Sequence, residues 1–322
     1  MAHDAGDLFG EESDSEDEAK PSKRPPDCGV LSFHAGVEEA MLLFVEQRVK
    51  GSGGAAAVLS AVDEFCVTRH WMMHVGPKKG AIFEGAVDLA RRCRWPGGSD
   101  GLFVLEFGSY CGYSAVLLST LLGHPEDRIV TIEVEKQAVG WARRLLALAG
   151  IANRVEVIHG DASKACEIVR QRGAGRGQEP ANAASVASVG FDCGKSAAGC
   201  ASGEGVGSPG GGEQSAAFSQ QSEEGYRVVD LLFLDHEKRR YLPDLLLAET
   251  LLVKGAVVVA DNITCFDKGA SMAPYLAHVR ESNGAFASSV FYESEVEYSL
   301  DEGHEDGVEV SVYGGHGQRT FS

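Results

Sequence analysis

Three oxygen-bearing side chains follow two apolar segments in the second half of the chain. Asp235 comes directly after the run Val228–Leu234, and Asp261 and Asn262 come directly after Val257–Ala260. Short apolar runs of this kind are typical of buried parallel strands, and ligands of open α/β sheets bind at the carboxyl ends of the strands. Two carboxylates and one amide that meet there suit a hard cation such as Mg²⁺, which leaves other positions for water and substrate.

A purely structural role is the alternative for each aspartate, because Asp is common at the N-caps of helices. An upstream segment argues against this alternative. There an apolar strand ends at Glu106, a turn with Gly108 and Gly112 follows, and a helix is predicted over Ser114–Leu122. A second strand ends at Glu133, 25 residues after Gly108, much as a ribose-binding acid follows a dinucleotide-binding turn.

The type of nucleoside is indicated by the glycine spacing. The turn reads G-x-x-x-G rather than G-x-G-x-x-G, so its backbone is not obviously shaped for a pyrophosphate. We therefore predict a nucleoside without phosphates, namely S-adenosylmethionine. Glu133 would accept hydrogen bonds from the ribose hydroxyls, and Glu106 would lie near the cationic methionine end, where a negative charge is favourable.

Motifs along most of the chain resemble those of the catechol O-methyltransferase family. They are WMMHVGPKKG, LEFGSYCGYSA, RIVTIEVE, FLDHEKRRYLPD, VVADN and EVEY, and they span roughly Glu38 to Tyr313 apart from one long insertion. The segment LDHEKRRYLPD separates this family from the related caffeoyl-CoA methyltransferases. The resemblance implies the α/β, Rossmann-like fold of class I methyltransferases, which has a mostly parallel seven-stranded sheet, helices on both faces and an antiparallel last strand.

The resemblance also implies methyl transfer from S-adenosylmethionine to one hydroxyl of a catechol. Asp235, Asp261 and Asn262 would hold Mg²⁺, and both catechol oxygens would complete its coordination. Lys238 would be the general base, in a neutral form that partial burial and the metal charge favour. Glu297 would hydrogen-bond the second hydroxyl. The alternatives are a solvated lysine on a helix and a glutamate on a polar strand face.

The remaining site positions come from the same resemblance. The residues implied to bind S-adenosylmethionine are Met73, Val75, Glu106, Gly108, Tyr110, Ser114, Glu133, Ala162, Ser163 and His236. Those implied to bind the catechol are Trp71, as an aromatic wall beside the ring, and Asp235, Lys238, Asn262 and Glu297. The apolar members could equally belong to the core, which is the commoner position of Met and Val.

The chain departs from the family at several positions. Glu237 stands where the family usually has a Trp, so an expected contact with adenine is absent. His74 replaces an Asn, and GDAS replaces the usual GASQ. The loop ITCFDKGASMAPY after Asn262 is longer than in the family and moves the proline that would line the catechol pocket.

Composition favours a cytoplasmic enzyme, and the chain is expected to be a monomer that acts on a small-molecule catechol. The net charge of -18 argues against nucleic acid as the main partner. The eight cysteines include no C-x-x-C pair and are predicted to be reduced thiols. No membrane partner is expected, because no run of 18 uninterrupted apolar residues occurs.

One folded domain is predicted, with two additions. Residues 1–33 are expected to form a disordered acidic tail that could bind an unknown partner. The methyltransferase domain covers 34–316 and is interrupted by a Gly/Ala/Ser-rich insertion at 173–225, predicted to be a disordered surface loop. Helices are expected over Val37–Val45, Val58–Cys66 and Ile82–Val87, alternating strands and helices over Phe103–Val169, and further strands over Val228–Leu234, Val257–Ala260, Ala287–Tyr292 and Val308–Tyr313.

Three other functions stay open. A methyltransferase of the same metal-dependent class could act on another vicinal diphenol, such as a caffeoyl ester. A catalytically dead binding module would keep the sites without turnover, although the intact Lys238 and metal set argue against it. A nicotinamide-dependent oxidoreductase would share the sheet but needs a phosphate-binding turn that this chain lacks.

Overall fold

The computed structural model describes residues 36–50, 53–94, 101–173, 228–265, 267–296 and 305–315. The predicted acidic tail, nearly all of the predicted insertion, and Glu297 lie outside the described residues. Every other residue that the sequence predicts for the site falls within these ranges.

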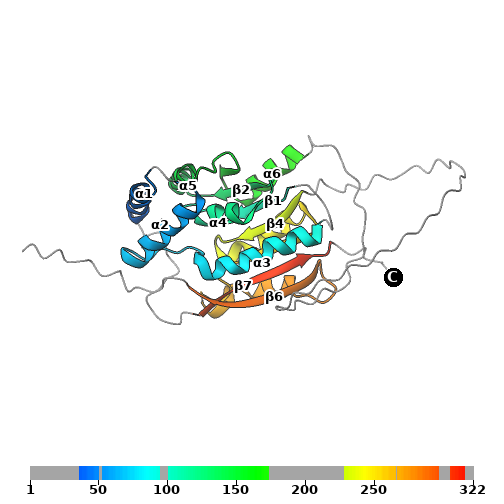
Figure 1. Cartoon of the computed structure of the whole chain (residues 1–322). Coiled ribbons are helices and arrows are strands. Elements are labelled where there is room, and N and C mark those ends of the chain that lie inside the picture. Colours follow the sequence, from blue (N-terminus) through cyan, green and yellow to red (C-terminus); the bar gives the residue numbers. More distant parts are fainter. Residues whose placement is uncertain are drawn as a thin grey trace, which may run out of the picture.

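A seven-stranded sheet lies at the centre of the molecule (Figure 1). Its strands are β1 (Phe103–Phe107), β2 (Arg128–Glu133), β3 (Val155–His159), β4 (Val229–Leu234), β5 (Leu252–Ala260), β6 (Phe286–Glu295) and β7 (Glu305–Tyr313). They are arranged in the order β3-β2-β1-β4-β5-β7-β6. Strands β1 to β5 are parallel, and β7 is antiparallel to both of its neighbours. The predicted mostly parallel sheet with an antiparallel last strand is confirmed.

Helices cover both faces of this sheet, as predicted. The α-helices are α1 (Val37–Arg48), α2 (Ala55–Thr68), α3 (Gly76–Arg94), α4 (Tyr113–Leu121), α5 (Lys136–Leu148), α6 (Ala162–Gly173), α7 (Tyr241–Ala248) and α8 (Ala273–Val279), and the short 3-10 helices are η2 (Lys238–Arg240) and η3 (Asp267–Met272). Successive strand residues point to opposite faces, so Val104 packs in the core beneath α1 to α5 and Leu105 in the core beneath α6 to α8.

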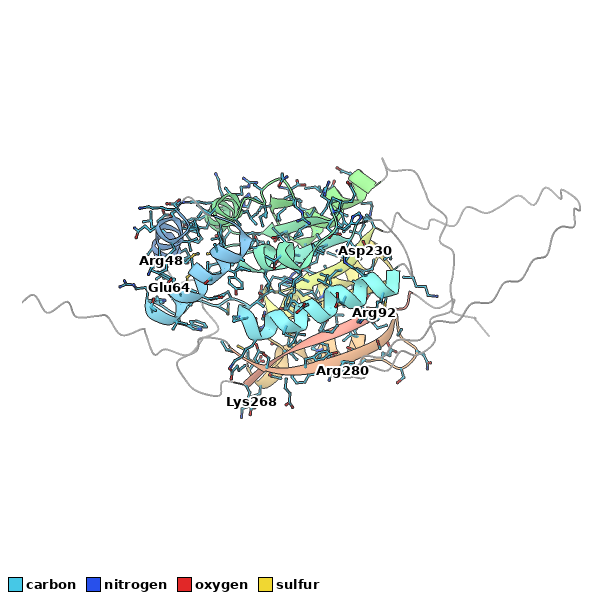
Figure 2. The ribbon with its side chains drawn as sticks, viewed as in Figure 1. Arg48, Glu64, Arg92, Asp230, Lys268 and Arg280 are labelled. Atoms are coloured by element: carbon cyan, nitrogen blue, oxygen red, sulfur yellow. The ribbon has the colours of Figure 1, made fainter. Side chains whose placement is uncertain are left out.

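The helices at the amino end confirm the predicted periodic segments as α1, α2 and α3. Arg48 on α1 and Glu64 on α2 form an exposed ion pair (Figure 2). Such a pair contributes little to stability. The contact between these helices therefore depends on buried apolar side chains such as Leu42 and Val62.

The segment after Asn262 corrects one expectation. The sequence predicts a long loop there, but the second half of the segment forms η3 and α8, and Pro274 lies in the first turn of α8. Proline is favourable there because the first helical N–H groups have no partner within the helix. The displaced proline of the predicted pocket is thus part of a helix start.

Two negative findings apply to the described ranges. No helix there is long and apolar enough to cross a membrane. The five described cysteines are free thiols.

The strand order indicates where a ligand-binding crevice should lie. The chain passes from β1 towards β2 on one side and from β4 towards β5 on the other, while β1 and β4 are neighbours. Ligands of open α/β sheets bind outside the carboxyl ends of the strands at such a reversal. Phe107 and Leu234, the last residues of β1 and β4, are paired there.

Candidate active site

The turn after β1 contacts the end of β4 through a glycine. Gly108 has a φ of +96°, and a Cβ atom on it would lie 2.5 Å from the carbonyl oxygen of Asp235. A side chain is excluded both by this backbone conformation and by this contact. The two predicted halves of the site, the nucleoside turn and the cation ligands, therefore meet at Gly108.

Glu106 is a buried carboxyl without a hydrogen-bond partner. It is 0% exposed, and neither of its carboxylate oxygens is hydrogen-bonded within the described structure. Desolvation by burial raises its pKa to about 7, while the nearby hydroxyls of Ser114 and Thr131 oppose the shift in part. Because an unpartnered buried carboxylate is costly, Glu106 is suited to a ligand that brings a positive charge or a donor.

Glu133 at the end of β2 is bound to the same turn. The backbone N–H of Tyr110 donates to Glu133 Oε2 over 2.8 Å, and that of Glu135 donates to Oε1 over 2.9 Å. Each oxygen keeps a further lone pair for another donor. The Tyr110 hydroxyl donates to Glu38 on α1 over 3.0 Å, so the first helix covers this part of the crevice.

His236 follows β4 directly and has one nitrogen without a partner. Its Nε2 lies 2.9 Å from Asp244 Oδ2, and its ring stacks on Tyr241 with centroids 5.0 Å apart. Its Nδ1 is buried and has no hydrogen-bond partner in the described part of the chain. Burial lowers the pKa of His236, so the neutral ring can present Nδ1 as an acceptor.

The other residues predicted to bind the nucleoside are distributed around this crevice. Ser114 lies in the first turn of α4, and Ala162 and Ser163 begin α6 directly after β3. Met73 and Val75 lie in the connection from α2 to α3, Val75 being buried and Met73 partly exposed. All of them except Met73 and Val75 follow the carboxyl ends of strands.

The three predicted metal ligands lie at the ends of neighbouring strands. The backbone N–H of Asp235 bonds to the Phe107 carbonyl over 2.9 Å, and that of Asp261 bonds to the Leu234 carbonyl over 3.0 Å. The N-cap residues of η2 and α7 are Glu237 and Arg240, so Asp235 does not cap either helix. The alternative role as a helix cap therefore does not apply to Asp235.

Lys238 lies between two of the predicted ligands. Its Nζ is 3.3 Å from Asp235 Oδ1 and 2.9 Å from Asn262 Oδ1, and it donates to the Tyr241 hydroxyl over 2.7 Å. Two side-chain oxygens from different strands thus converge on one positive charge. Desolvation raises the pKa of Asp235 to about 7, with the Lys238 ammonium opposing and the charge of Asp261 adding to the shift.

This donor set fits a hard cation. Within the described ranges no group of three or more His, Cys, Asp or Glu side chains could hold a metal ion. Asp235, Asp261 and Asn262 instead offer two carboxylates and one amide, which are oxygen donors of the kind that Mg²⁺ prefers.

Sequence reasoning missed two buried charged residues beside these ligands. Lys79 on α3 donates to Asp261 Oδ1 over 2.6 Å and to Asp306 Oδ2 over 2.5 Å. Burial alone would raise the pKa of Asp306, but the Lys79 ammonium outweighs it, so the pKa lies below its usual value. The available signal was helical spacing: Lys79 shares a face with Phe83 and Ala90, and a charge at a core position requires a partner.

Two predicted substrate contacts stay predictions. Trp71 is 1% exposed and precedes α3, so its ring is enclosed by the protein. Glu297 lies beyond the part of the chain that the structure describes.

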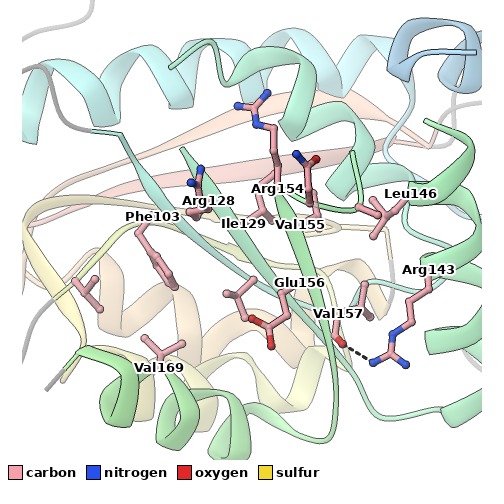
Figure 3. Close-up of a pocket in the computed structure, with 14 residues that line it drawn as sticks. Phe103, Arg128, Ile129, Arg143, Leu146, Arg154, Val155, Glu156, Val157 and Val169 are labelled. Carbon is pink, nitrogen blue, oxygen red and sulfur yellow. Dashed lines mark hydrogen bonds between the residues drawn. The ribbon is translucent and has the colours of Figure 1, made fainter. Parts of the chain in front are cut away.

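A cavity lies elsewhere, near the amino ends of the strands (Figure 3). Its volume is about 650 Å³, and Phe103, Arg128 and Arg154 are among its lining residues. Arg154 donates to the Leu122 carbonyl and Arg143 to the Val157 carbonyl, each over 2.9 Å. None of the predicted site residues lines this cavity.

Comparisons with known proteins identify the family to which this chain is similar. The O-methyltransferase family model matches residues 98–177. The chain is 33% identical over 249 residues to a catechol O-methyltransferase of Sus scrofa, which covers 76% of this chain and 95% of that protein. It is 31% identical over 263 residues to catechol O-methyltransferase B of Danio rerio, which covers 81% of this chain and 73% of that protein.

A solved structure supports the fold alone. It is a candidate caffeoyl-CoA O-methyltransferase from Staphylococcus aureus, with a TM-score of 0.51 and 14% identity. The superposition covers 86% of this chain and all of that one.

Proposed function

Because the chain belongs to the catechol O-methyltransferase family, we propose that it transfers a methyl group from S-adenosylmethionine to one hydroxyl of a catechol. The observation that carries this proposal is the convergence of Asp235 and Asn262 side-chain oxygens on the Lys238 ammonium. This arrangement places two oxygens that could hold a cation beside a nitrogen that, as the neutral amine, could accept a proton. It lies directly beside the turn that contains Gly108.

The methyl donor would be held by the turn and the neighbouring strand ends. Glu106 supplies an unpartnered carboxylate for the cationic methionine end, and Glu133 keeps lone pairs for the ribose hydroxyls. The further residues proposed to contact the donor are Met73, Val75, Gly108, Tyr110, Ser114, Ala162, Ser163 and His236. Placing the donor against the strand ends would bring its methyl group to the crevice that Lys238 borders.

On the substrate side, Asp235, Asp261 and Asn262 would hold Mg²⁺. When bound, Mg²⁺ would lower the pKa of the catechol hydroxyl and fix both vicinal oxygens. Lys238 would take the proton of the attacking hydroxyl at Nζ, which requires the neutral amine. Trp71 and Glu297 are proposed to bind the ring and the second hydroxyl. Much of the rate enhancement would come from holding oxygen and methyl at near-attack distance.

The test measures methyl transfer from labelled S-adenosylmethionine to a catechol, a caffeoyl ester and a monophenol, with Mg²⁺ or with EDTA. We expect turnover of the catechol that needs Mg²⁺ and rejection of the monophenol, because one oxygen cannot chelate a cation. Preference for the caffeoyl ester would favour the alternative of a metal-dependent methyltransferase that acts on another vicinal diphenol. Binding of S-adenosylhomocysteine without any turnover would favour the binding module, and equal turnover of monophenol in EDTA would sink the proposal.

A further inference from the structure

Lys79 is the one Lys or Arg side chain buried among the described residues. It is 2% exposed, and its Nζ lies between Asp261 Oδ1 at 2.6 Å and Asp306 Oδ2 at 2.5 Å. Burying an ammonium group is costly unless it is paired and fully hydrogen-bonded. The Lys79 ammonium is paired at the point where α3, the end of β5 and the start of β7 come together.

Asp306 uses both of its oxygens to hold the segment after β5. Oδ2 accepts from Lys79 and from Asn262 Nδ2, the latter over 2.9 Å. Oδ1 accepts from the backbone N–H groups of Thr264, over 3.3 Å, and Cys265, over 3.1 Å. A single carboxylate on β7 thus binds four donors, three of which belong to the segment that carries the proposed ligands.

These contacts decide which atoms face the crevice. An amide binds a cation through its oxygen, and a carboxylate can only accept, so the contact with Asp306 assigns Nδ2 of Asn262 to the buried side. Asn262 Oδ1 is then turned to Lys238, 2.9 Å away. At Asp261, Oδ1 is taken by Lys79 and by the backbone N–H of Asn262, which leaves Oδ2 for another ligand.

The backbone beside Asn262 also contacts β7. Asn262 has a φ of 55°, in the left-handed region that asparagine adopts more readily than most residues other than glycine. The N–H of the next residue, Ile263, donates to the Gly307 carbonyl on β7 over 3.0 Å. Strand β7 therefore holds both the backbone and the side chain of this proposed ligand.

We propose that Lys79 and Asp306 are positioning residues for divalent-cation binding: together they turn the amide oxygen of Asn262 and one carboxylate oxygen of Asp261 into the crevice. In this role both residues would act through Asp261 and Asn262 rather than bind the cation themselves. The inference deepens the proposed function and rests on it, since it assumes that these oxygens bind a divalent cation. Residues around metal ligands act in this way when they fix the orientation of the ligands.

The test uses Mn²⁺ as the probe and the full-length Asp306→Asn variant. Bound Mn²⁺ is measured by electron paramagnetic resonance, S-adenosylhomocysteine binding by calorimetry without metal, and unfolding by urea. We expect Mn²⁺ affinity to fall about 10- to 100-fold, with S-adenosylhomocysteine affinity within about twofold of the wild type. A merely structural role would weaken both ligands together with stability.

Glu309→Gln is the matched control. Glu309 lies on the same strand, is equally buried and accepts from Arg280, the C-cap of α8, over 2.7 Å. Its side-chain hydrogen bonds in the described ranges involve no proposed ligand. It should leave Mn²⁺ affinity unchanged. If Asp306→Asn does not fold, the double variant Lys79→Met/Asp306→Asn, which removes both charges of the pair, carries the same measurement.

The outcomes separate this inference from the proposed function. Wild-type protein that binds no Mn²⁺ contradicts the metal-dependent function. The NMR signals of the Asn262 side-chain amide in metal-free protein then test the positioning role. Asp306→Asn should shift these signals and Glu309→Gln should not. A folded Asp306→Asn variant with wild-type Mn²⁺ affinity, a parallel loss of both ligands, or unshifted Asn262 signals overturns the inference.

Discussion

The two ends of the parallel sheet differ in what their charged side chains contact. At the amino ends, Arg143 and Arg154 border a cavity of about 650 Å³, yet both donate to backbone carbonyls. At the carboxyl ends, Glu106 has no hydrogen-bond partner in the described structure, and Lys238 bridges oxygens of different strands. A backbone carbonyl needs a donor whatever the protein does. Unpartnered or converging ionisable groups therefore distinguish the carboxyl end, where the proposed site lies, whereas the cavity lies at the amino end.

Asp235→Asn should have the largest effect at the carboxyl end. The substitution removes a charged ligand, so Mg²⁺-dependent turnover should be lost, by roughly 10³-fold or more if the cation stabilises the transition state by several kcal/mol. S-adenosylhomocysteine binding should survive, because the proposed nucleoside site is formed by Glu133 and the Gly108 turn instead. Turnover and calorimetric binding are compared on the same preparation. Equal loss of both in folded protein would show that Asp235 is structural.

Lys238→Met should come next in magnitude. If Lys238 is the general base, the turnover number should fall by about 10²- to 10⁴-fold with little change in metal or donor affinity. A higher pH should restore part of the rate, because solvent can then take the proton. Single-turnover rates across pH provide the measurement, and wild-type turnover near neutral pH would refute the assignment.

Glu106→Gln should change how stability depends on pH. The pKa of Glu106 is raised from 4.5 to about 7. Between these values the folded state binds more protons than the unfolded state, so the free energy of unfolding falls as pH rises. For one group the slope is at most about 1.4 kcal/mol per pH unit. In ligand-free protein, the neutral glutamine should reduce this slope of the free energy of unfolding against pH.

Urea unfolding of wild type and Glu106→Gln at several pH values from about 4.5 to about 7.5 measures this slope. Part of the slope should remain in the variant, because the pKa of Asp235 is also raised to about 7 and titrates in the same window. An identical slope in both proteins would mean that Glu106 is already ionised in the folded state at low pH.

Arg143→Leu should have the smallest effect and tests the other end of the sheet. It removes the hydrogen bond to the Val157 carbonyl but no proposed site residue. Stability should fall by at most about 1 kcal/mol, with turnover unchanged. Methyl transfer and urea unfolding check both statements. A large loss of turnover at unchanged stability would show that the amino-end cavity is functional.

Local patterns predicted the carboxyl end well. Apolar runs followed by Asp235 or Glu133 can be read from neighbouring residues, and the strands end where those runs end. The pairing of Lys79 with Asp306 could not be found in this way, because 227 residues separate the two. Helix α8 was missed because it is only seven residues long, too short to show a helical period, and it follows the kinked η3 that contains Gly269.

The close contact at Gly108 should couple the affinities of the two proposed ligands. The Gly108 Cα lies so close to the Asp235 carbonyl that even a methyl group would not fit, so the turn proposed to bind the nucleoside and the strand end proposed to bind the cation share one backbone contact. A ligand that shifts the turn would therefore also shift the backbone of Asp235. Linkage then requires reciprocity: whatever factor the methyl donor applies to cation affinity, the cation applies to donor affinity. Gly108→Ala would separate the two surfaces, and cooperativity between the ligands is the quantity that it should change.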